Sequence, residues 1–460
     1  MTLAIETSCD DTSVAVLESQ PNARLGKTAA RLHFHKKVTA NNAAFNGVHP
    51  LAALESHQEN LASLVSEAIN HLPEKRSPDF ISVTRGPGMR SNLFTGLDTA
   101  KGLAVAWQIP LVGVHHMQAH ALTPRLVAAL ETSGHLPQLW QNTHTGGATI
   151  RAEPEFPFLS VLASGGHTLI IHSATLTGHK VLGSTSDVAV GECLDKIARA
   201  VLPVDELQKA GDTMYGALLE NFAFSKNNVP RPREALSSEL RRQTQSTVLF
   251  EKNSARGYRM KYESHYTYQV PKNNEDALQR NMSRWGWAFN QPLAKASGGL
   301  KNKSLEMSFS GLMTAVERAV RYQRDQPSGK LTKIERSPKD ISLEERRDMA
   351  QFSMRAAFEH VAARVVLALQ HTPVSTVVMA GGVAANSYLR YILASTLCAH
   401  GYDDMQVVFP PPKLCSDNAA MIAWAGTEMY QAGITNPLTI RAVRKWPLDQ
   451  LLSPPLEKTT

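Results

Sequence analysis

The sequence predicts an α/β fold with two similar halves, and three observations support this prediction. Short apolar runs of strand length alternate with longer segments in which apolar residues recur at helical spacing. Glycine-rich turns follow several of the predicted strands. The same order of strand, glycine turn and helix recurs later in the chain. Such repetition is typical of a duplicated architecture with a cleft between its halves.

The first half is predicted to alternate strands and helices from its beginning. Its predicted strands are apolar runs bounded by polar or glycine turns, and they cover 3–5, 14–17, 80–84 and 111–114. Its predicted helices have apolar residues at helical spacing, and they cover 51–71, 93–107 and the histidine-rich segment that begins near 115.

The second half is predicted to follow a loop over 131–155 that is rich in Gly, Thr, His and Pro. Its predicted elements are the strand 158–162, the helix 193–202, the helix 346–370, the strand 376–380, the helix within 381–397, a strand ending at 410–412 and a last helix from 418. Segment 226–303 lacks periodic apolar faces and is interpreted as an insertion. We therefore expect a first lobe of 1–122 completed by 418–450, and a second lobe of 156–417 interrupted by 226–303.

The charge of the chain is unevenly distributed. The formal net charge is +7, and segment 226–303 alone holds 15 Lys and Arg residues against 6 Asp and Glu residues. A concentrated basic segment is a candidate footprint for the phosphates of a nucleic acid or for anionic lipid.

Composition and cysteine spacing exclude several classes of protein. The four cysteines form no C-x-x-C pair, which favours free thiols over a disulfide framework or a cysteine zinc site. No apolar run approaches the length of a transmembrane helix, so we expect no membrane association. The first residues have the features of neither a secretory signal nor a transit peptide, so we expect no presequence within this numbering.

Three residues are candidate metal ligands. His116 and His120 lie four residues apart, so on a helix their rings share one face and can bind one metal ion. A zinc peptidase needs a glutamate beside the first histidine, and Met117 stands there instead. Asp417 opens the last predicted helix, where it is either a third ligand or the N-cap. Two imidazoles and one carboxylate would suit Fe(II) or Zn(II).

Three glycine turns, at 86–88, 164–168 and 380–386, favour nucleotide binding, because glycine lets a phosphate approach the backbone at a helix start. The sequence contains neither a P-loop nor a Rossmann fingerprint. Asp195 lies among apolar residues of a predicted helix, where Arg199 is placed four residues on to pair with it.

Eight segments together resemble the tRNA N6-adenosine threonylcarbamoyltransferase family, formerly called glycoproteases. The segments are 5–12, 84–88, 115–120, 156–168, 191–196, 308–312, 380–386 and 410–424. They occur in the family's order across about residues 1–430. The resemblance implies an actin-like, sugar-kinase-like pair of lobes around a nucleotide cleft.

The resemblance also implies site residues. His116, His120 and Asp417 match the family's metal ligands, with one divalent ion, Fe or Zn, per subunit. Asp195 is expected to be catalytic, and Gly211 is the best replacement for a glycine of the family's Pro-Gly-Gly loop, which this chain lacks. The residues expected to bind substrate are Leu162, Ala163, Ser164, Gly165, Gly166, Asp195, Gly211 and Asn386.

The implied reaction transfers a threonylcarbamoyl group from threonylcarbamoyl-adenylate, supplied by a separate synthase, to N6 of the adenosine next to the anticodon. The implied acceptors are tRNAs that read codons beginning with adenine, and a homodimer is expected. Ser8-Cys9-Asp10 and His167 resemble the bacterial and organellar branch. A eukaryote-style insertion on that branch implies a mitochondrial location, with the cytoplasm as the alternative.

With tRNA as the implied substrate, the basic segment is predicted to contact phosphates. Its aromatic residues are predicted to stack on unpaired bases; they are Tyr258, Tyr262, Tyr266, Trp285 and Trp287. A solvated insertion without a role is the alternative. Three other functions stay open at this point: an actin-like ATPase or small-molecule kinase, a metallopeptidase, and a noncatalytic tRNA-binding scaffold.

Overall fold

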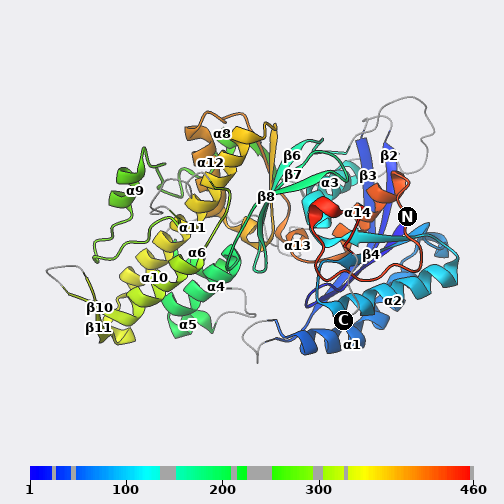
Figure 1. Cartoon of the computed structure of the whole chain (residues 1–460), viewed down its shortest axis with the longest axis horizontal. Coiled ribbons are helices and arrows are strands. Elements are labelled where there is room, and N and C mark those ends of the chain that lie inside the picture. The colour runs from blue at the N-terminus through cyan, green and yellow to red at the C-terminus, as the bar shows by residue number, and fades with distance from the viewer. Residues whose placement is uncertain are drawn as a thin grey trace, which may run out of the picture.

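The chain forms two α/β lobes in a computed structural model (Figure 1). The structure describes residues 1–22, 27–42, 48–134, 152–208, 215–224, 251–293, 304–325 and 330–455. The first lobe, with the N-terminus, lies on the right of Figure 1, and the second lobe lies on the left. In these ranges no helix is both long and apolar enough to span a membrane.

The first lobe contains a five-stranded sheet in the order β3-β2-β1-β4-β5. The strands are β1 (Thr2–Glu6), β2 (Asp11–Asn22), β3 (Lys27–Thr39), β4 (Phe80–Gly86) and β5 (Leu111–His115). The lobe's helices are α1 (Pro50–Asn70), α2 (Arg90–Trp107), α3 (His116–Gly134) and α14 (Ala419–Gln431). β1 is antiparallel to β2 and parallel to β4.

Helices cover both faces of this sheet. Leu3 and Ile5 of β1 belong to the apolar cluster that includes α1 and α2, whereas Ala4 belongs to the cluster that includes α3 and α14. Successive side chains of a strand point to opposite faces, so a strand covered on both sides is apolar throughout. This explains the unbroken apolar run at the start of the sequence.

The second lobe repeats this topology. Its six-stranded sheet has the order β8-β7-β6-β12-β13-β9, and its first five strands match the order and directions of the first sheet. The strands are β6 (Phe158–Ala163), β7 (Thr168–Ser173), β8 (His179–Ser184), β9 (Glu251–Ser254), β12 (Thr376–Ala380) and β13 (Gln406–Phe409). The predicted two-lobed α/β fold with two similar halves is therefore confirmed.

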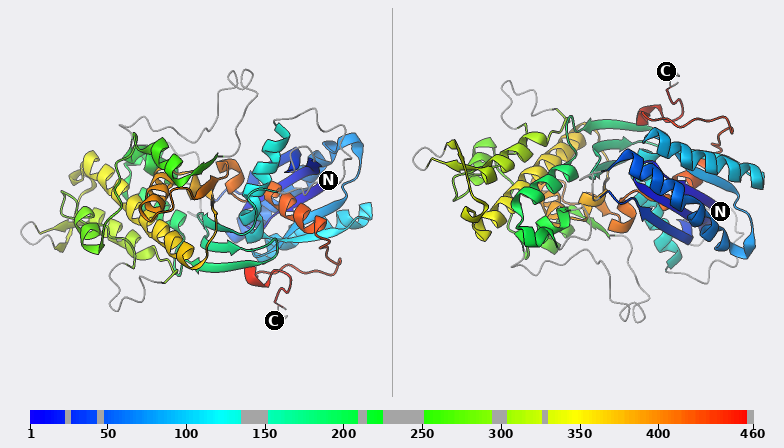
Figure 2. Two further views of the ribbon diagram at one scale, coloured as in Figure 1. Left: turned by 90° about the horizontal axis from the view of Figure 1, so that it is seen from above. Right: turned by 90° about the horizontal axis from the view of Figure 1, so that it is seen from below.

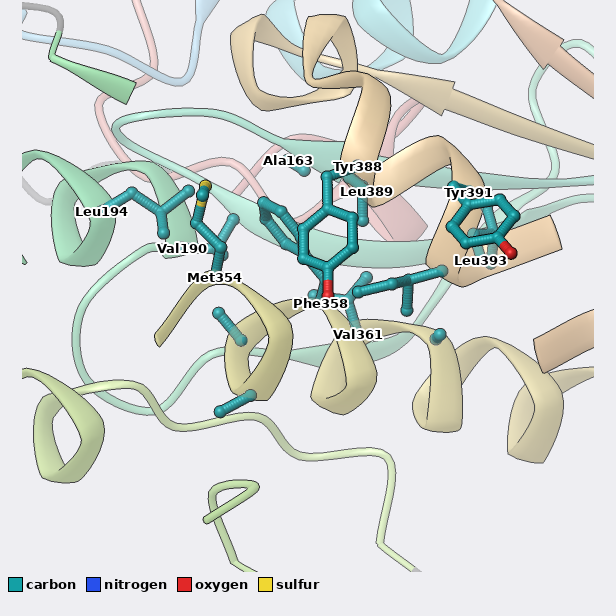
Figure 3. Packing of buried hydrophobic residues seen from close by; sticks show 14 of the residues in the cluster. Ala163, Val190, Leu194, Met354, Phe358, Val361, Tyr388, Leu389, Tyr391 and Leu393 are labelled. Carbon is teal, nitrogen blue, oxygen red and sulfur yellow. The ribbon is translucent and has the colours of Figure 1, made fainter. Parts of the chain in front are cut away.

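Helices of the second lobe build most of its core. They are α4 (Val190–Val201), α5 (Val204–Leu207), α6 (Gly216–Ala223), α8 (Ala255–Tyr262), α9 (Asn274–Arg280), α10 (Ser310–Arg321), α11 (Leu343–His371), α12 (Ser387–Ala399) and α13 (Pro412–Cys415). Tyr388 of α12 packs against Phe358 of α11, with ring centroids 6.2 Å apart (Figure 3). A small hairpin, β10 (Tyr322–Arg324) and β11 (Leu331–Glu335), follows α10, and the 3-10 helices are η2 (Pro73–Lys75), η5 (Pro338–Asp340), η6 (Gly382–Ala385) and η7 (Leu448–Gln450).

The described part of segment 226–303, residues 251–293, is built into this lobe. β9 pairs antiparallel with β13 at the sheet edge, and α8 packs against α12. Four of the five aromatic residues predicted to stack on bases have buried side chains; they are Tyr258, Tyr262, Tyr266 and Trp287. The stacking prediction is wrong for these four, because they contribute to the core. Eight of the segment's 15 basic residues lie outside the described ranges.

The last described residues, 434–455, form a C-terminal strap that returns across the first lobe (Figure 2). The amide of Val443 donates to the carbonyl of Arg85 at 2.8 Å, which ties the strap to the end of β4. Further along, Leu448 and Leu451 pack in one cluster with Met117 of α3 and Leu162 of β6. The strap therefore contacts both lobes beside the start of α3.

Candidate functional site

The three predicted metal ligands lie where the chain crosses between the lobes. α3 begins at His116 and leads from the first sheet to the second, whereas Asp417 precedes α14, which returns to the first sheet. Nε2 of His120 lies 3.0 Å from Oδ1 of Asp417, and Nε2 of His116 lies 3.4 Å from the same oxygen. One ligand atom from each residue lies within 4.8 Å of the others. Folding thus brings the three predicted ligands together.

Local structure presents each side chain to this point. His116 and His120 occupy successive turns of α3, and their rings meet edge to face with centroids 4.7 Å apart. Asn418, not Asp417, caps α14, because its Oδ1 accepts the amide of Met421 at 3.0 Å. The N-cap alternative for Asp417 is therefore wrong, and its carboxylate faces the histidines.

The charges of the group attract one another strongly. Burial by itself would lower the pKa of His116, but the nearby charges of Asp417 and Glu6 raise it to about 10. Burial would raise the pKa of Asp417, but the two histidines hold it well below its usual range. The space between His116, His120 and Asp417 therefore favours a positive charge. Two imidazole nitrogens and a carboxylate oxygen that converge there fit a divalent ion such as Zn(II) or Fe(II).

A second layer of polar residues supports His116. Glu6, at the end of β1, is fully buried, and its Oε2 lies 3.2 Å from Nδ1 of His116. Thr84 donates to the same carboxylate, and Oγ of Ser8 lies 3.1 Å from Nδ1 of His116. Glu6 was not among the predicted site residues. The available signal was an acidic residue at the end of an otherwise apolar strand.

His115 fixes the start of α3. Its Nε2 donates to the carbonyl of Trp446 at 2.9 Å, and its Nδ1 accepts the amide of Met117 at 3.1 Å. Burial lowers the pKa of His115 to about 3, so the ring is neutral and these two bonds define its tautomer. The C-terminal strap thereby helps to orient the first turn of α3.

A second group of predicted residues lies around the Ser164–Gly166 turn between β6 and β7. The amide of Gly191 in α4 donates to the carbonyl of Ser164 at 3.1 Å. A side chain at Gly191 would lie 2.6 Å from that oxygen, and one at Gly381 would overlap the carbonyl of Ala163. The start of α4 and the start of η6 therefore meet this turn closely only because glycine occupies both positions.

Gly165 and Gly166 are exposed, and no atom lies within 4 Å of a side-chain position on either. Their backbone is open to a ligand beside the N-terminus of α4, whose amides and helix dipole favour negative charge. By contrast, the side chains of Leu162 and Ala163 are buried in the core. Within residues 162–166, the accessible part is therefore the Ser164–Gly166 turn.

Asp195 and Asn386 each anchor the start of a helix. Oδ1 of Asp195 accepts the amides of Tyr215 and Gly216 at 2.8 and 3.0 Å, before and at the start of α6. Oδ1 of Asn386 caps α12 by accepting the amide of Leu389 at 3.0 Å. The prediction for Gly211 lies outside the described residues.

The turn at 86–88 does not belong with this group. A side chain at Gly86 would overlap the carbonyl of Val443, and one at Gly88 would lie 2.7 Å from the carbonyl of Ser8. The space in front of these glycines is thus filled by the protein's own chain. Both glycines therefore permit close packing of the chain at this turn, and the expectation that the turn faces a nucleotide stays a prediction.

His167 lies beside the glycine turn. It follows Gly166 in the turn, and its side chain is exposed. Neighbouring atoms partly desolvate the His167 ring, which lowers its pKa. The positive charges of His116 and His120 lower this pKa further, to about 4. His167 therefore lies within electrostatic reach of the candidate metal ligands.

The sequence of this chain matches one protein family and relatives from other organisms. The sequence profile of the family described as "TsaD: tRNA N6-adenosine threonylcarbamoyltransferase" matches residues 33–140, 141–252 and 255–424. A mitochondrial tRNA N6-adenosine threonylcarbamoyltransferase of Schizosaccharomyces pombe is 32% identical, over 98% of this chain and 87% of that protein. A tRNA N6-adenosine threonylcarbamoyltransferase of Paracoccus denitrificans is 30% identical, over 99% of this chain and 96% of that protein.

Two solved structures align with most of this chain. HypF of T. kodakarensis aligns with 94% of this chain and 48% of its own chain, at 13% identity and a TM-score of 0.43. Component A of the (R)-2-hydroxyglutaryl-CoA dehydratase of Acidaminococcus fermentans aligns with 93% of this chain and 98% of its own, at 13% identity and a TM-score of 0.37.

Proposed function

Because this chain belongs to the tRNA N6-adenosine threonylcarbamoyltransferase family, we propose that it performs the transfer with a divalent metal ion bound by His116, His120 and Asp417. The family assignment makes the chain an enzyme that modifies N6 of an adenosine in tRNA. The metal proposal rests on one observation. Three ligand atoms, from the two segments where the chain crosses between the lobes, lie within 4.8 Å of one another. The matching family and the two relatives support this transfer rather than the kinase, peptidase or scaffold alternatives.

We further propose that the donor is threonylcarbamoyl-adenylate and that its phosphate lies at the Ser164–Gly166 turn. Support comes from the exposed glycine backbone and the N-terminus of α4, both of which favour an anion. Asp195 is the proposed catalytic residue and Asn386 a proposed nucleotide ligand. The side chain of Asp195 accepts a backbone amide just before α6, and that of Asn386 accepts a backbone amide in α12. The position of each side chain is therefore well defined.

The reaction forms a bond between N6 of adenosine and the carbamoyl carbon, and it breaks the bond from that carbon to the phosphate oxygen, so AMP leaves. An exocyclic adenine amine is a poor nucleophile, so positioning and charge stabilisation supply most of the rate. A bound metal ion would supply Lewis-acid stabilisation of the threonylcarbamoyl oxygens. The turn and α4 would hold the phosphate, and Asp195 would hydrogen-bond the nucleotide.

The direct test is reconstitution of the modification. Enzyme, threonine, bicarbonate, ATP, a threonylcarbamoyl-adenylate synthase and unmodified tRNA are mixed, and the modified nucleoside is measured by mass spectrometry. We expect Asp417→Asn to lose both bound metal and most activity, whereas Asp404→Asn, at an exposed acidic residue, retains both. Full activity of metal-depleted Asp417→Asn would overturn the metal proposal.

Contact with tRNA phosphates by the basic segment is a separate proposal. On α8, Arg259 and Lys261 are exposed, whereas Tyr258 and Tyr262 are buried. Replacing both with glutamate should weaken tRNA binding and flatten its salt dependence, because fewer counterions are released. Unchanged binding and slope would contradict a role for α8. The melting temperature of the variant serves as the folding control.

The mitochondrial location and the homodimer are also proposals. The location is supported by the relative of Schizosaccharomyces pombe, which is described as mitochondrial. Imaging of the tagged protein in a eukaryotic cell tests the location, and analytical ultracentrifugation tests the oligomeric state.

A further inference from the structure

We propose that Glu6 is a positioning residue that keeps hydrogen on Nδ1 of His116, so that Nε2 of the same ring is presented to the metal ion. The inference rests on the proposed metal site and extends it to a residue outside the ligand set. Glu6 lies on β1, far in sequence from His116, and its side chain is fully buried.

The His116 ring spans the space between Glu6 and the other ligands. Its Nδ1 lies 3.2 Å from Oε2 of Glu6. Its Nε2 lies 3.4 Å from Oδ1 of Asp417 and 3.2 Å from Nε2 of His120. One ring nitrogen therefore faces the buried carboxylate, and the other faces the point where the ligand atoms converge.

One hydrogen arrangement satisfies the carboxylate of Glu6 in its ionised form. Thr84 donates its hydroxyl to Oε2 of Glu6, and the amide of Ser8 donates to Oε1. An ionised carboxylate only accepts hydrogen bonds, so Nδ1 of His116 donates as well. Ser8 also contacts Nδ1 through Oγ, but a hydroxyl can donate or accept and therefore selects no tautomer.

With hydrogen on Nδ1, the lone pair of a neutral His116 ring is on Nε2, where a metal ion would bind. Such outer partners orient a ligating histidine and raise its basicity, and their loss typically lowers metal affinity by about 10- to 100-fold. Burial of Glu6 leaves its carboxylate little freedom to move, which makes the orientation of the ring persistent.

Glu6→Gln is the informative variant because it preserves the shape of the side chain. If its amide oxygen accepts the amide of Ser8, its NH2 group faces Nδ1 of His116 and Thr84. The NH2 group would then donate to Nδ1 and favour hydrogen on Nε2, which blocks the nitrogen that is proposed to bind the metal.

The first measurement is Zn2+ affinity by competition with a chromophoric chelator. We expect Glu6→Gln to weaken Zn2+ binding by about 10- to 100-fold. The matched control is Glu220→Gln, because Glu220 is another poorly accessible carboxylate that accepts backbone amides, those of Ser387 and Tyr388 in the second lobe. This control should lower the melting temperature without changing Zn2+ affinity. Equal Zn2+ affinity of folded Glu6→Gln and wild-type protein would overturn the proposal.

The second measurement needs no substitution at Glu6. The wild-type protein is labelled on the ring nitrogens of histidine and loaded with Zn2+, and NMR identifies the His116 signals by their loss in His116→Gln. Hydrogen on Nδ1 and metal on Nε2 is the expected result, and metal on Nδ1 would overturn the proposal. Failure of the wild-type protein to bind any divalent metal would instead refute the metal site itself.

Discussion

Nε2 of His115 donates a hydrogen bond to the carbonyl oxygen of Trp446, 331 residues further along the chain, at 2.9 Å. His115 directly precedes His116, the first candidate metal ligand. The C-terminal strap therefore reaches the residue next to the proposed site, and its apolar anchors, Leu448 and Leu451, keep it there.

The strap should contribute measurably to stability. We expect Leu448→Ala to lower the free energy of unfolding by about 2–5 kcal/mol, because it leaves a cavity beside Met117 and Leu162. Leu452→Ala is the control, since Leu452 is 60% exposed and should change stability little. Guanidinium unfolding of both variants gives the comparison, and equal effects would contradict an anchoring role for Leu448.

A buried ion pair joins α3 to α14. Arg125 donates to both carboxylate oxygens of Glu428, at 2.8 and 3.0 Å. Glu428→Ala leaves a buried, uncompensated charge and should cost about 3–5 kcal/mol of unfolding free energy. The exposed pair of Lys36 and Glu67 is the control, and Glu67→Ala should cost less than about 1 kcal/mol. A loss for Glu428→Ala as small as that of the control would refute this prediction.

Gly381 should tolerate no side chain. Its φ of +97° is unfavourable for other residues, and a methyl group would overlap the carbonyl of Ala163. Gly381→Ala is therefore expected to lower the melting temperature strongly and to displace the turn that leads to Asn386. Gly382→Ala, where no atom lies within 4 Å, should leave the melting temperature nearly unchanged. Similar melting temperatures for the two variants would show that the turn adapts.

Asp187 should make stability depend on pH. Burial acts to raise its pKa, but hydrogen bonds from Ser308, Phe309 and Ser310 hold it well below the ordinary value of 3.8. Because the pKa of Asp187 is lower in the folded state than in the unfolded state, its ionised carboxylate stabilises the folded protein at pH values above the unfolded-state pKa. This contribution is lost as the pH falls through the folded-state pKa. The stability difference between wild type and Asp187→Asn should be constant above about pH 5 and shrink below about pH 4. Unfolding curves across this range test it, and a difference that does not change with pH would contradict the prediction.

Strands covered on both faces were predictable because burial makes them apolar throughout, as for β1, β4 and β12. β3 was not predicted, since Arg31, Lys36 and other polar residues interrupt its apolar pattern at the edge of the sheet. The strand β8 was not predicted either, because buried and exposed residues are mixed along it.

Local sequence also misled in one place. The residues from 251 to 293 are polar overall, which favoured an exposed insertion, yet the aromatic residues Tyr258, Tyr262 and Trp287 are buried. A helix such as α8 buries one narrow face, so two well-placed aromatic residues suffice to dock it against the core.

Local sequence patterns are enough to predict the alternation of strands and helices, the duplicated order of the two halves, and the spacing that places His116 and His120 on one helix face. These features depend on residues close together in the chain, where helical and strand periodicities apply. The three-dimensional packing was needed to show that Asp417 faces the histidines rather than capping α14, and that Glu6 and Trp446 support the start of α3. Those contacts join residues more than one hundred positions apart, and no local periodicity encodes which distant residues the packing of two sheets will bring together.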